Sequence, residues 1–138
     1  MDAPKFVHKG FEGPIRDTLL YADKGWPEIE RVHAAKITLL DKQIGRLLEK
    51  LKEMNQLDNT LILFTSDNGP HYAIDEHQLE FFDSNGKFKG GKRDLYEGGI
   101  RVPLIAYWNQ NIASGTVSNH ISSFQDIMPT FSDIIGFK

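Results

Sequence analysis

The sequence predicts an α/β fold with a mainly parallel sheet flanked by helices, and three observations support this. A long amphipathic segment, residues 28–54, leads through a short polar stretch into a continuous apolar run at 60–65. A helix that feeds such a strand is the second half of a β-α-β unit, from which parallel sheets are built. A second apolar run at 102–108 and an apolar helical pattern at 123–135 follow.

The segment 28–54 has the clearest helical pattern. Its apolar residues recur at steps of three and four, which places them on one stripe of a helix. They are Ile29, Val32, Ile37, Leu40, Ile44, Leu47, Leu48 and Leu51. Pro27 suits the first helical turn, because its missing N–H breaks no bond there. Residues 1–27 have no sustained period and are predicted to be an irregular lead-in, so 28–138 forms a helix–strand–loop–strand–helix core.

The two apolar runs are predicted to be strands. The run at 60–65 has no polar alternation, which is typical of a strand buried on both faces of a parallel sheet. Pro103 stands at the start of the second run, where its missing donor matters least. Residues 66–102 between them are polar and rich in glycine, and such long loops are usually functional or disordered. In the last helix, Gly136 is the stop, and Pro129 predicts a kink or a start near Asp126.

The composition excludes several classes of protein. The 138 residues suit one domain, and 16 Lys and Arg against 19 Asp and Glu give a net charge of -3. No overall basic field therefore exists to hold a nucleic acid or an anionic membrane. Zero cysteines exclude a disulfide framework, a zinc-thiolate site and a cysteine nucleophile within these residues. No apolar run approaches the roughly 20 residues that a membrane span requires.

A candidate metal site follows the first strand directly. Ligands of open α/β sheets lie beyond the carboxyl ends of strands, where Asp67 and Asn68 offer a carboxylate and an amide oxygen. Hard oxygen donors suit Ca²⁺ or Mg²⁺. Ca²⁺ needs about six oxygens, so further ligands must come from elsewhere. An isolated Asp-Asn-Gly sequence is also typical of a plain turn, and the residues alone leave both interpretations open.

A candidate anion site lies in the loop 87–103. Five cations among glycines can hold a tetrahedral oxyanion such as sulfate or phosphate. They are Lys87, Lys89, Lys92, Arg93 and Arg101. The alternative is a solvated loop whose cations pair with its two acids, Asp94 and Glu97.

Two motifs in order resemble the sulfatase family of the alkaline-phosphatase-like superfamily. They are S-D-N-G-P-H at residues 66–71 and K-R-D-L-Y-E-G-G-I-R-V-P at residues 92–103. Residues 40–45 and 59–65 resemble the stretch that precedes the family's Ser-Asp-Asn-Gly turn. The resemblance runs from about His33 to Gly136. It implies that residues 1–138 are the later portion of a sulfatase catalytic domain, with a partial alkaline-phosphatase-like fold.

The resemblance also implies roles for individual residues. Asp67 and Asn68 match two ligands of the divalent cation, usually Ca²⁺, and Lys92 matches the lysine that contacts the sulfate group. His71 matches a position beside the substrate in one subgroup, with loop packing as the alternative. The E-G-G-x-R sequence at 97–101 matches a signature that we assign to shaping the loop. A metal ion and a fixed ammonium stabilise the charge that develops when a sulfate monoester is hydrolysed.

Other parts of the family pattern have no match here. The family's nucleophile is a formylglycine made from Cys or Ser in a Cys/Ser-x-Pro-Ser-Arg motif, and no Pro-Ser-Arg occurs in the chain. An adjacent pair of aspartates is likewise missing. We therefore expect the formylglycine in an upstream segment and no activity from the isolated chain. Exposed flanks of the strand at 61–64 predict self-association or swapped assembly of the isolated chain.

Alternatives to a sulfatase portion are a phosphoesterase or phosphotransferase of the same superfamily, and a non-catalytic module that binds anions. The subgroup resemblance implies a sulfated carbohydrate as partner, and family members of this type imply a periplasmic or secreted location. Among the histidines, His33 is expected to be a partly buried packing residue, whereas His77 and His120 lie in polar loops and are expected to be exposed.

Overall fold

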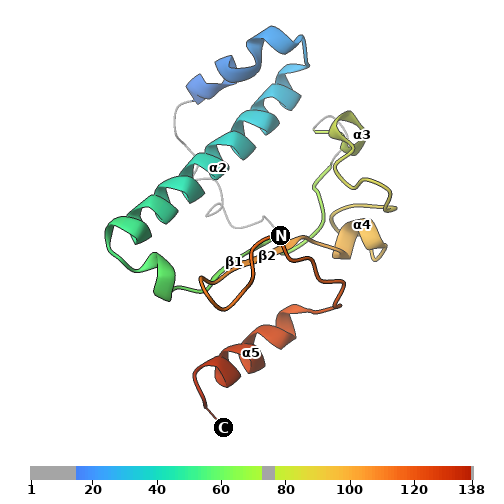
Figure 1. Cartoon of the computed structure of the whole chain (residues 1–138). Coiled ribbons are helices and arrows are strands. Elements are labelled where there is room, and N and C mark those ends of the chain that lie inside the picture. Colours follow the sequence, from blue (N-terminus) through green and yellow to red (C-terminus); the bar gives the residue numbers. More distant parts are fainter. Residues whose placement is uncertain (1–14, 73–76, 138) are drawn as a thin grey trace, which may run out of the picture.

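The computed structural model describes residues 15–72 and 77–137. Along these residues lie η1 (Ile15–Lys24), α2 (Glu28–Glu53), η2 (Leu57–Asn59), β1 (Ile62–Thr65), α3 (Leu79–Phe82), α4 (Glu97–Ile100), β2 (Leu104–Tyr107), η3 (Phe124–Asp126) and α5 (Ile127–Ile134). α2 and η1 lie on one side of the two strands and α5 on the other (Figure 1). The α/β content agrees with the sequence prediction.

The long helix α2 is confirmed, and its ends show why it starts and stops there. Its first turn carries Glu28 and Glu30 and its last turn Lys50 and Lys52, which complements the helix dipole at both ends. At the carboxyl end Asn55 takes a left-handed conformation, with φ of 54°. The N–H of Asn55 then bonds to Lys52 O at 3.0 Å, and that of Gln56 to Leu51 O at 2.9 Å. This pair of bonds is the Schellman stop of a helix.

Part of the predicted irregular segment 1–27 is ordered. η1 occupies Ile15–Lys24, with a kink at Tyr21, and packs against α2. The hydroxyls of Tyr21 and Thr38 share a hydrogen bond of 2.7 Å across this contact. Residues 1–14 lie outside the described residues.

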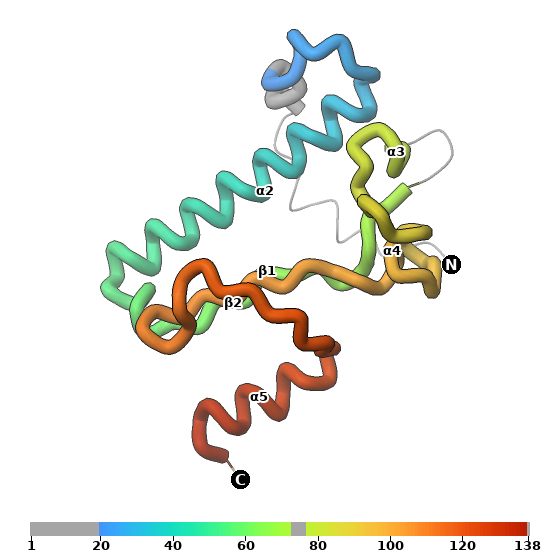
Figure 2. Tube along the Cα trace, turned by 45° about the vertical axis from the view of Figure 1, so that its right-hand side comes forward, coloured from blue at the N-terminus to red at the C-terminus, as the bar shows by residue number. Residues whose placement is uncertain are grey.

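The two predicted strands exist, but they pair antiparallel. Ile62 stands opposite Tyr107 and Thr65 opposite Leu104, and Thr65 Oγ1 also donates to Pro103 O at 2.8 Å. The chain between them makes a wide excursion that carries α3 and α4 and returns along β1 (Figure 2). The expectation of a mainly parallel sheet therefore does not hold for these strands. The loop 66–103 reverses the chain, whereas a parallel pair needs a crossover that restores its direction.

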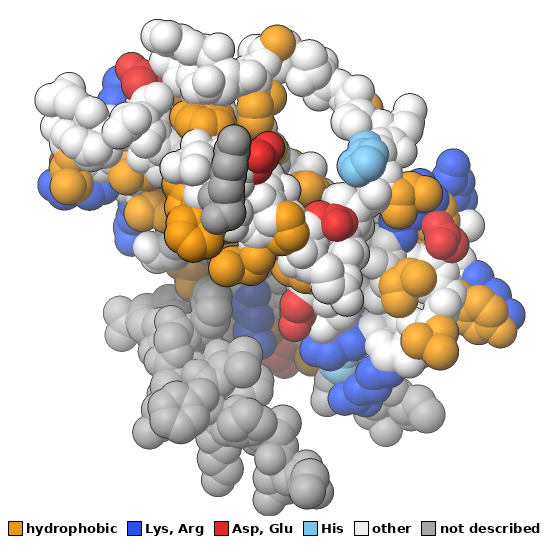
Figure 3. Space-filling view, turned by 90° about the horizontal axis from the view of Figure 1, so that it is seen from below, with side chains coloured by type: hydrophobic (Ala, Val, Ile, Leu, Met, Phe, Trp, Pro, Cys, Tyr) orange, Lys and Arg blue, Asp and Glu red, His pale blue; other side chains and the backbone are white. Residues whose placement is uncertain are grey.

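The strands are also less buried than predicted. β1 is half-buried with Phe64 exposed, and all four residues of β2 are exposed. None of the described helices packs closely against the two strands. Hydrophobic side chains instead reach the surface widely, as in the face seen in Figure 3. Within the described part of the chain, Ala35 and Leu79 are the only buried hydrophobic residues, while Val117 and Ile121 are 91% and 89% exposed.

The last predicted helix is confirmed and begins beside Asp126. η3 leads into α5, and the Asp126 carboxylate caps this start, because its Oδ2 accepts from the backbone N–H of Ser123 at 2.7 Å. Pro129 falls in the first turn of α5, where its missing backbone N–H breaks no helical hydrogen bond. Of the described helices, none is both long and apolar enough to cross a membrane.

Candidate functional site

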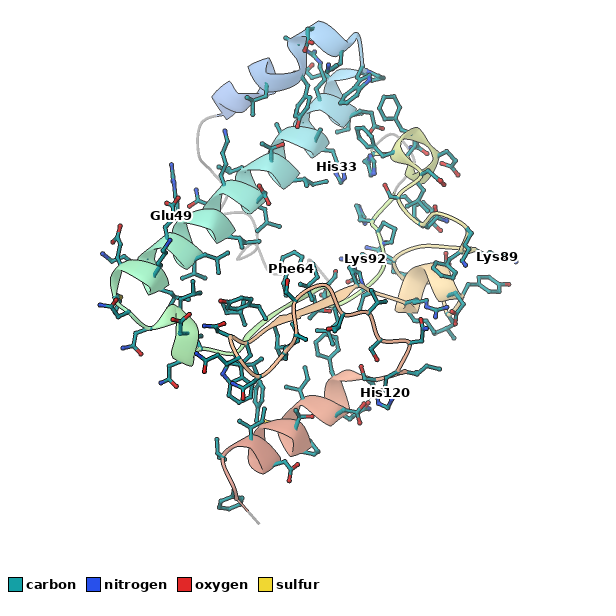
Figure 4. All side chains as sticks on the ribbon, viewed as in Figure 1. His33, Glu49, Phe64, Lys89, Lys92 and His120 are labelled. Carbon is teal, nitrogen blue, oxygen red and sulfur yellow. The ribbon has the colours of Figure 1, made fainter. Side chains whose placement is uncertain are left out.

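Two backbone hydrogen bonds join the two motifs that sequence analysis singled out. The N–H of Gly69 donates to Gly99 O at 2.8 Å, and the N–H of Lys92 donates to Pro70 O at 2.8 Å. The turn after β1 and the cationic loop before β2 therefore lie side by side. In Figure 4, Lys92 lies on the inner side of this loop, whereas Lys89 lies at its outer edge.

The joint between the motifs requires glycine. Gly69 and Gly98 are both buried. A Cβ atom added to Gly69 would lie 1.9 Å from Gly98 O, and one added to Gly98 would lie 2.1 Å from Gly90 O. These neighbours are backbone atoms and cannot swing aside as a side chain can. Only residues without a Cβ allow the two segments to approach this closely.

The predicted metal ligands lie in a turn whose conformation is fixed locally. Ser66 Oγ donates to Asn68 O at 2.8 Å, and Asn68 Nδ2 donates to Gly69 O at 2.8 Å. Because the amide nitrogen of Asn68 is engaged, its Oδ1 is the atom left for a cation. Asp67 is exposed, and its carboxylate makes no hydrogen bond or ion pair with any described residue. The donor set therefore fits a hard cation.

A complete metal site is not formed by the described residues alone. No group of three or more His, Cys, Asp or Glu side chains among them is placed to hold an ion. Asp67 and Asn68 offer two oxygens, and the origin of any further ligands is not tested by this structure. Their role in metal binding stays a prediction.

Lys92 is a half-buried cation without an acidic partner. It makes no ion pair with any described residue. The two acids of the loop are engaged elsewhere. Asp94 Oδ2 accepts from the backbone N–H of Gly91 at 2.9 Å and from the Tyr72 hydroxyl at 3.1 Å. That hydrogen bond and the charge of Asp94 raise the pKa of Tyr72.

The alternative of a self-neutralised loop holds for one cation. Arg101 Nη1 pairs with Glu97 Oε2 at 2.8 Å, four residues earlier in the chain. The carboxylate of Glu97 is therefore engaged by Arg101. Lys89 Nζ instead lies 3.9 Å from the centre of the Tyr96 ring, a cation–π contact. Lys92 and Arg93 pair with neither acid. Within the described part of the chain, these two cations are therefore left without a paired acid next to the turn of Asp67.

Arg93 has an unusual backbone conformation. Its φ is 81°, in the left-handed region, as are those of Asn55, Asp83 and Gln110 among the described residues other than glycine. Asn and Asp tolerate this region, because their short side chains bond locally, but Arg does not share that property. The conformation costs roughly 1–2 kcal/mol for an ordinary residue. Arg93 is exposed, and its side chain has no partner among the described residues.

His71 is exposed, at the end of the metal-candidate turn. Burial is the main cause of the lowered pKa of His33 on α2, and the charge of His71 is the smallest of the contributions. Neither of its predicted roles, substrate contact or loop packing, is tested by this arrangement. It stays a prediction.

A buried polar cluster joins α2 to α3, and sequence analysis missed it. His77 Nδ1 and Glu30 Oε2 form a pair 2.5 Å apart, and Glu30 Oε1 accepts from the N–H of Gln78 at 3.2 Å. His77 and Glu30 are 5% and 3% exposed, so the expectation of an exposed His77 was wrong. His33 stacks on His77 with ring centres 3.7 Å apart. No sequence signal pairs residues 47 positions apart.

Aromatic side chains close this cluster. Trp26 meets Phe81 and Phe82 edge-on, with ring centres 5.8 and 5.2 Å apart. These contacts place Phe81 and Phe82 against Trp26. Through these contacts, the first part of the chain segment that leads to Lys92 is attached to the amino-terminal half of α2.

We expect the folded state to lose stability in mild acid through His33. Burial first, then His77, lowers the pKa of His33 from 6.5, while Glu30 opposes this and Lys36 and His71 add to it. The unfolded chain takes up a proton at about pH 6.5, but the folded chain does so only at lower pH. The free energy of unfolding therefore falls as the pH drops below about 6.5.

The free energy of unfolding, measured by chemical denaturation at about pH 7.5 and about pH 5.5, tests this expectation. Its change between the two pH values is compared among the unchanged protein and two variants. His33→Gln cannot take up a proton and should flatten the pH dependence. His120→Gln, at an exposed position, is the matched control and should keep it. Equal slopes for His33→Gln and the unchanged protein would contradict the assignment.

Comparison with known proteins identifies the family. The sulfatase family model matches residues 8–137. Arylsulfatase H of Canis lupus familiaris is 41% identical over 98 residues, which cover 70% of this chain and 17% of that protein. For N-acetylgalactosamine-6-sulfatase of Homo sapiens the identity is 37% over 97 residues, covering 70% and 18%. For steryl-sulfatase of Homo sapiens it is 32% over 147 residues, covering 99% and 25%.

A solved structure agrees with these relatives. The crystal structure of Ps i-CgsB in complex with k-i-k-neocarrahexaose superposes with a TM-score of 0.76 at 32% identity. The match covers 92% of this chain and 27% of that one, so the chain spans about a quarter or less of the relatives it matches. The neighbour supports an alkaline-phosphatase-like fold. Matched along nearly its whole length, the chain belongs to the sulfatase family, as its two motifs indicated.

Proposed function

We propose that the chain is part of the catalytic domain of a sulfatase that hydrolyses sulfate monoesters of a sulfated carbohydrate. Lys92 contacts the sulfate group and acts in catalysis, and Asp67 and Asn68 are two ligands of a Ca²⁺ ion. The observation that carries the proposal is Lys92 itself. It is a half-buried ammonium without an acidic partner among the described residues, held beside the Asp67 turn by its own backbone N–H.

The electrostatics of the two segments support sulfate ester hydrolysis. Negative charge grows on the leaving oxygen and spreads over the sulfuryl oxygens as the S–O bond breaks. A fixed ammonium such as that of Lys92 stabilises this charge more than the charge of the bound ester, which lowers the barrier. A bound Ca²⁺ would supply Lewis-acid stabilisation of the same oxygens, held in part by the oxygens of Asp67 and Asn68.

A sulfated glycan is the substrate class that the neighbour favours. The related structure is a complex with a neocarrahexaose, and it matches this chain at 32% identity over 92% of its length. We extend a carbohydrate substrate to this protein on that basis, with His71 as a further substrate contact. A periplasmic or secreted location fits a glycan of this kind.

The exposed apolar surface supports a larger parent domain. β2 is exposed at all four positions, and the hydrophobic core of the described residues is very small. Large hydrophobic surfaces of this kind are normally covered by other chain segments. We propose that the remainder of a sulfatase domain buries this surface. That remainder would also contain the formylglycine nucleophile. The isolated chain is then inactive and self-associates through its uncovered strands.

The test uses the longer sulfatase that we propose contains this chain, with sulfated oligosaccharides as substrates and Ca²⁺ as the variable. Asp67→Ala should raise the Ca²⁺ concentration for half-maximal turnover at least ~10-fold, because one charged ligand is lost. Asp41→Ala on the exposed surface of α2 is the matched control and should leave it unchanged. The isolated 138-residue chain serves as the inactive reference.

Three results would count against the proposal. Turnover of phosphate esters in preference to sulfate esters would favour the phosphoesterase alternative. Binding of anions by the longer protein without turnover would favour a non-catalytic module. Equal Ca²⁺ dependence in Asp67→Ala and the unchanged enzyme would remove Asp67 from the metal site.

A further inference from the structure

We propose that Arg93 binds a second anionic group on the same sulfated glycan, so that the site selects substrates carrying two sulfate groups close together. This inference rests on the proposed function and names a narrower class of substrate. Arg93 directly follows Lys92, and its exposed guanidinium has no partner among the described residues.

The backbone of Arg93 points to a role for its side chain. Its φ of 81° suits glycine, which would adopt this conformation without strain. The turn around it is held by other atoms. The N–H of Lys92 bonds to Pro70 O, and the N–H of Asp94 bonds to Gly91 O at 2.9 Å. These bonds do not use the arginine side chain, and residues with strained backbone cluster at functional sites.

The other loop cations are engaged or lie elsewhere. Arg101 is paired with Glu97, and Lys89 is held over the Tyr96 ring at the outer edge of the loop. Lys87 Nζ lies 5.6 Å from the centre of the Phe88 ring. Arg93 thus combines a free charged group with direct attachment to Lys92.

The chemistry of arginine fits an oxyanion. Its planar guanidinium donates two parallel N–H bonds to sulfate oxygens, whereas Lys92 acts as a point charge. The Cα atoms of residues 92 and 93 are about 3.8 Å apart, as in any trans peptide. Two long side chains from adjacent positions can therefore contact two neighbouring groups of one sugar chain. A substrate whose sulfate groups lie far apart along the sugar chain would leave Arg93 in water and gain nothing from it.

The test compares two carrageenan hexasaccharides with one backbone, one carrying a single sulfate per disaccharide and one carrying two. Their affinities for the longer sulfatase are measured by calorimetry in metal-free buffer, and their turnover is measured with Ca²⁺. The unchanged protein should prefer the doubly sulfated ligand. Arg93→Gln and Arg93→Gly should each reduce that preference about 10-fold, the effect of losing a hydrogen-bonded charge. Lys42→Gln, an exposed cation on α2, should keep it.

Arg93→Gly adds a readout that a structural role would not give. It should raise the melting temperature, because the left-handed strain is relieved, while the preference falls. Arg93→Lys should keep part of the preference through its charge. An unchanged preference in both Arg93→Gln and Arg93→Gly, or no preference in the unchanged protein, would overturn the inference.

The two proposals fail in different ways. If selective binding depends on Arg93 but neither hexasaccharide is turned over, the inference stands and the sulfatase activity fails. If both are turned over and the variants keep the same selectivity, the activity stands and the role of Arg93 is overturned.

Discussion

Replacing Lys92 by methionine is expected to lower kcat/KM for a sulfate ester by about 100- to 1,000-fold, the usual effect of removing one preorganised group that stabilises transition-state charge. Methionine keeps most of the length and apolar volume of the lysine stem. Lys92 makes no ion pair with a described residue, so the change leaves no acid unpaired. The loss should therefore appear in the rate and not in the folding.

Lys89→Met is the matched control for Lys92→Met. Both residues are cations of the same loop, but Lys89 lies at its outer edge over Tyr96. Steady-state kinetics on the longer sulfatase should show a change of no more than about threefold for Lys89→Met, since an exposed cation–π contact contributes little. Similar kinetics for the two variants would show that general charge, and not Lys92, supports turnover.

The local elements could be predicted because their signals lie within short windows. The stripe of apolar residues indicated α2, and the uninterrupted apolar runs indicated β1 and β2. Pro129 indicated either a kink or a start near Asp126, and the structure has the start there. The two motifs likewise identified the family. Each of these inferences uses residues that are neighbours in the sequence, where periodicity and turn chemistry act directly.

The long-range features could not be predicted in the same way. The antiparallel pairing of β1 with β2 depends on how the loop 66–103 folds back, and apolar runs do not encode strand direction. The pair of Glu30 and His77 joins residues 47 positions apart, and a polar context made exposure of His77 the natural expectation. Burial failed for a further reason. The faces of β2 have no cover among the described residues, and a single sequence cannot show that.

Gly69→Ala is expected to separate the two segments of the candidate site. The new Cβ would lie 1.9 Å from Gly98 O, so the turn 66–71 and the loop 89–101 must move apart. The bond from Gly69 N–H to Gly99 O would lengthen, and the nearby bond from Lys92 N–H to Pro70 O would be strained. Overpacking of this kind costs about 1–3 kcal/mol of unfolding free energy. It should also lower turnover, because Lys92 is displaced relative to Asp67.

Gly45→Ala gives the same chemical change where space is open. Gly45 lies inside α2, and outside that helix's own backbone no described residue has an atom within 4 Å of the position that the alanine Cβ would take. Alanine is the better helix former, so this variant should gain about 0.5–1 kcal/mol. Urea unfolding and turnover of both variants, each in the longer sulfatase, separate the two effects. If Gly69→Ala kept full stability and full turnover, the segments could not be packed backbone against backbone. The joint between Asp67 and Lys92 would then need another explanation.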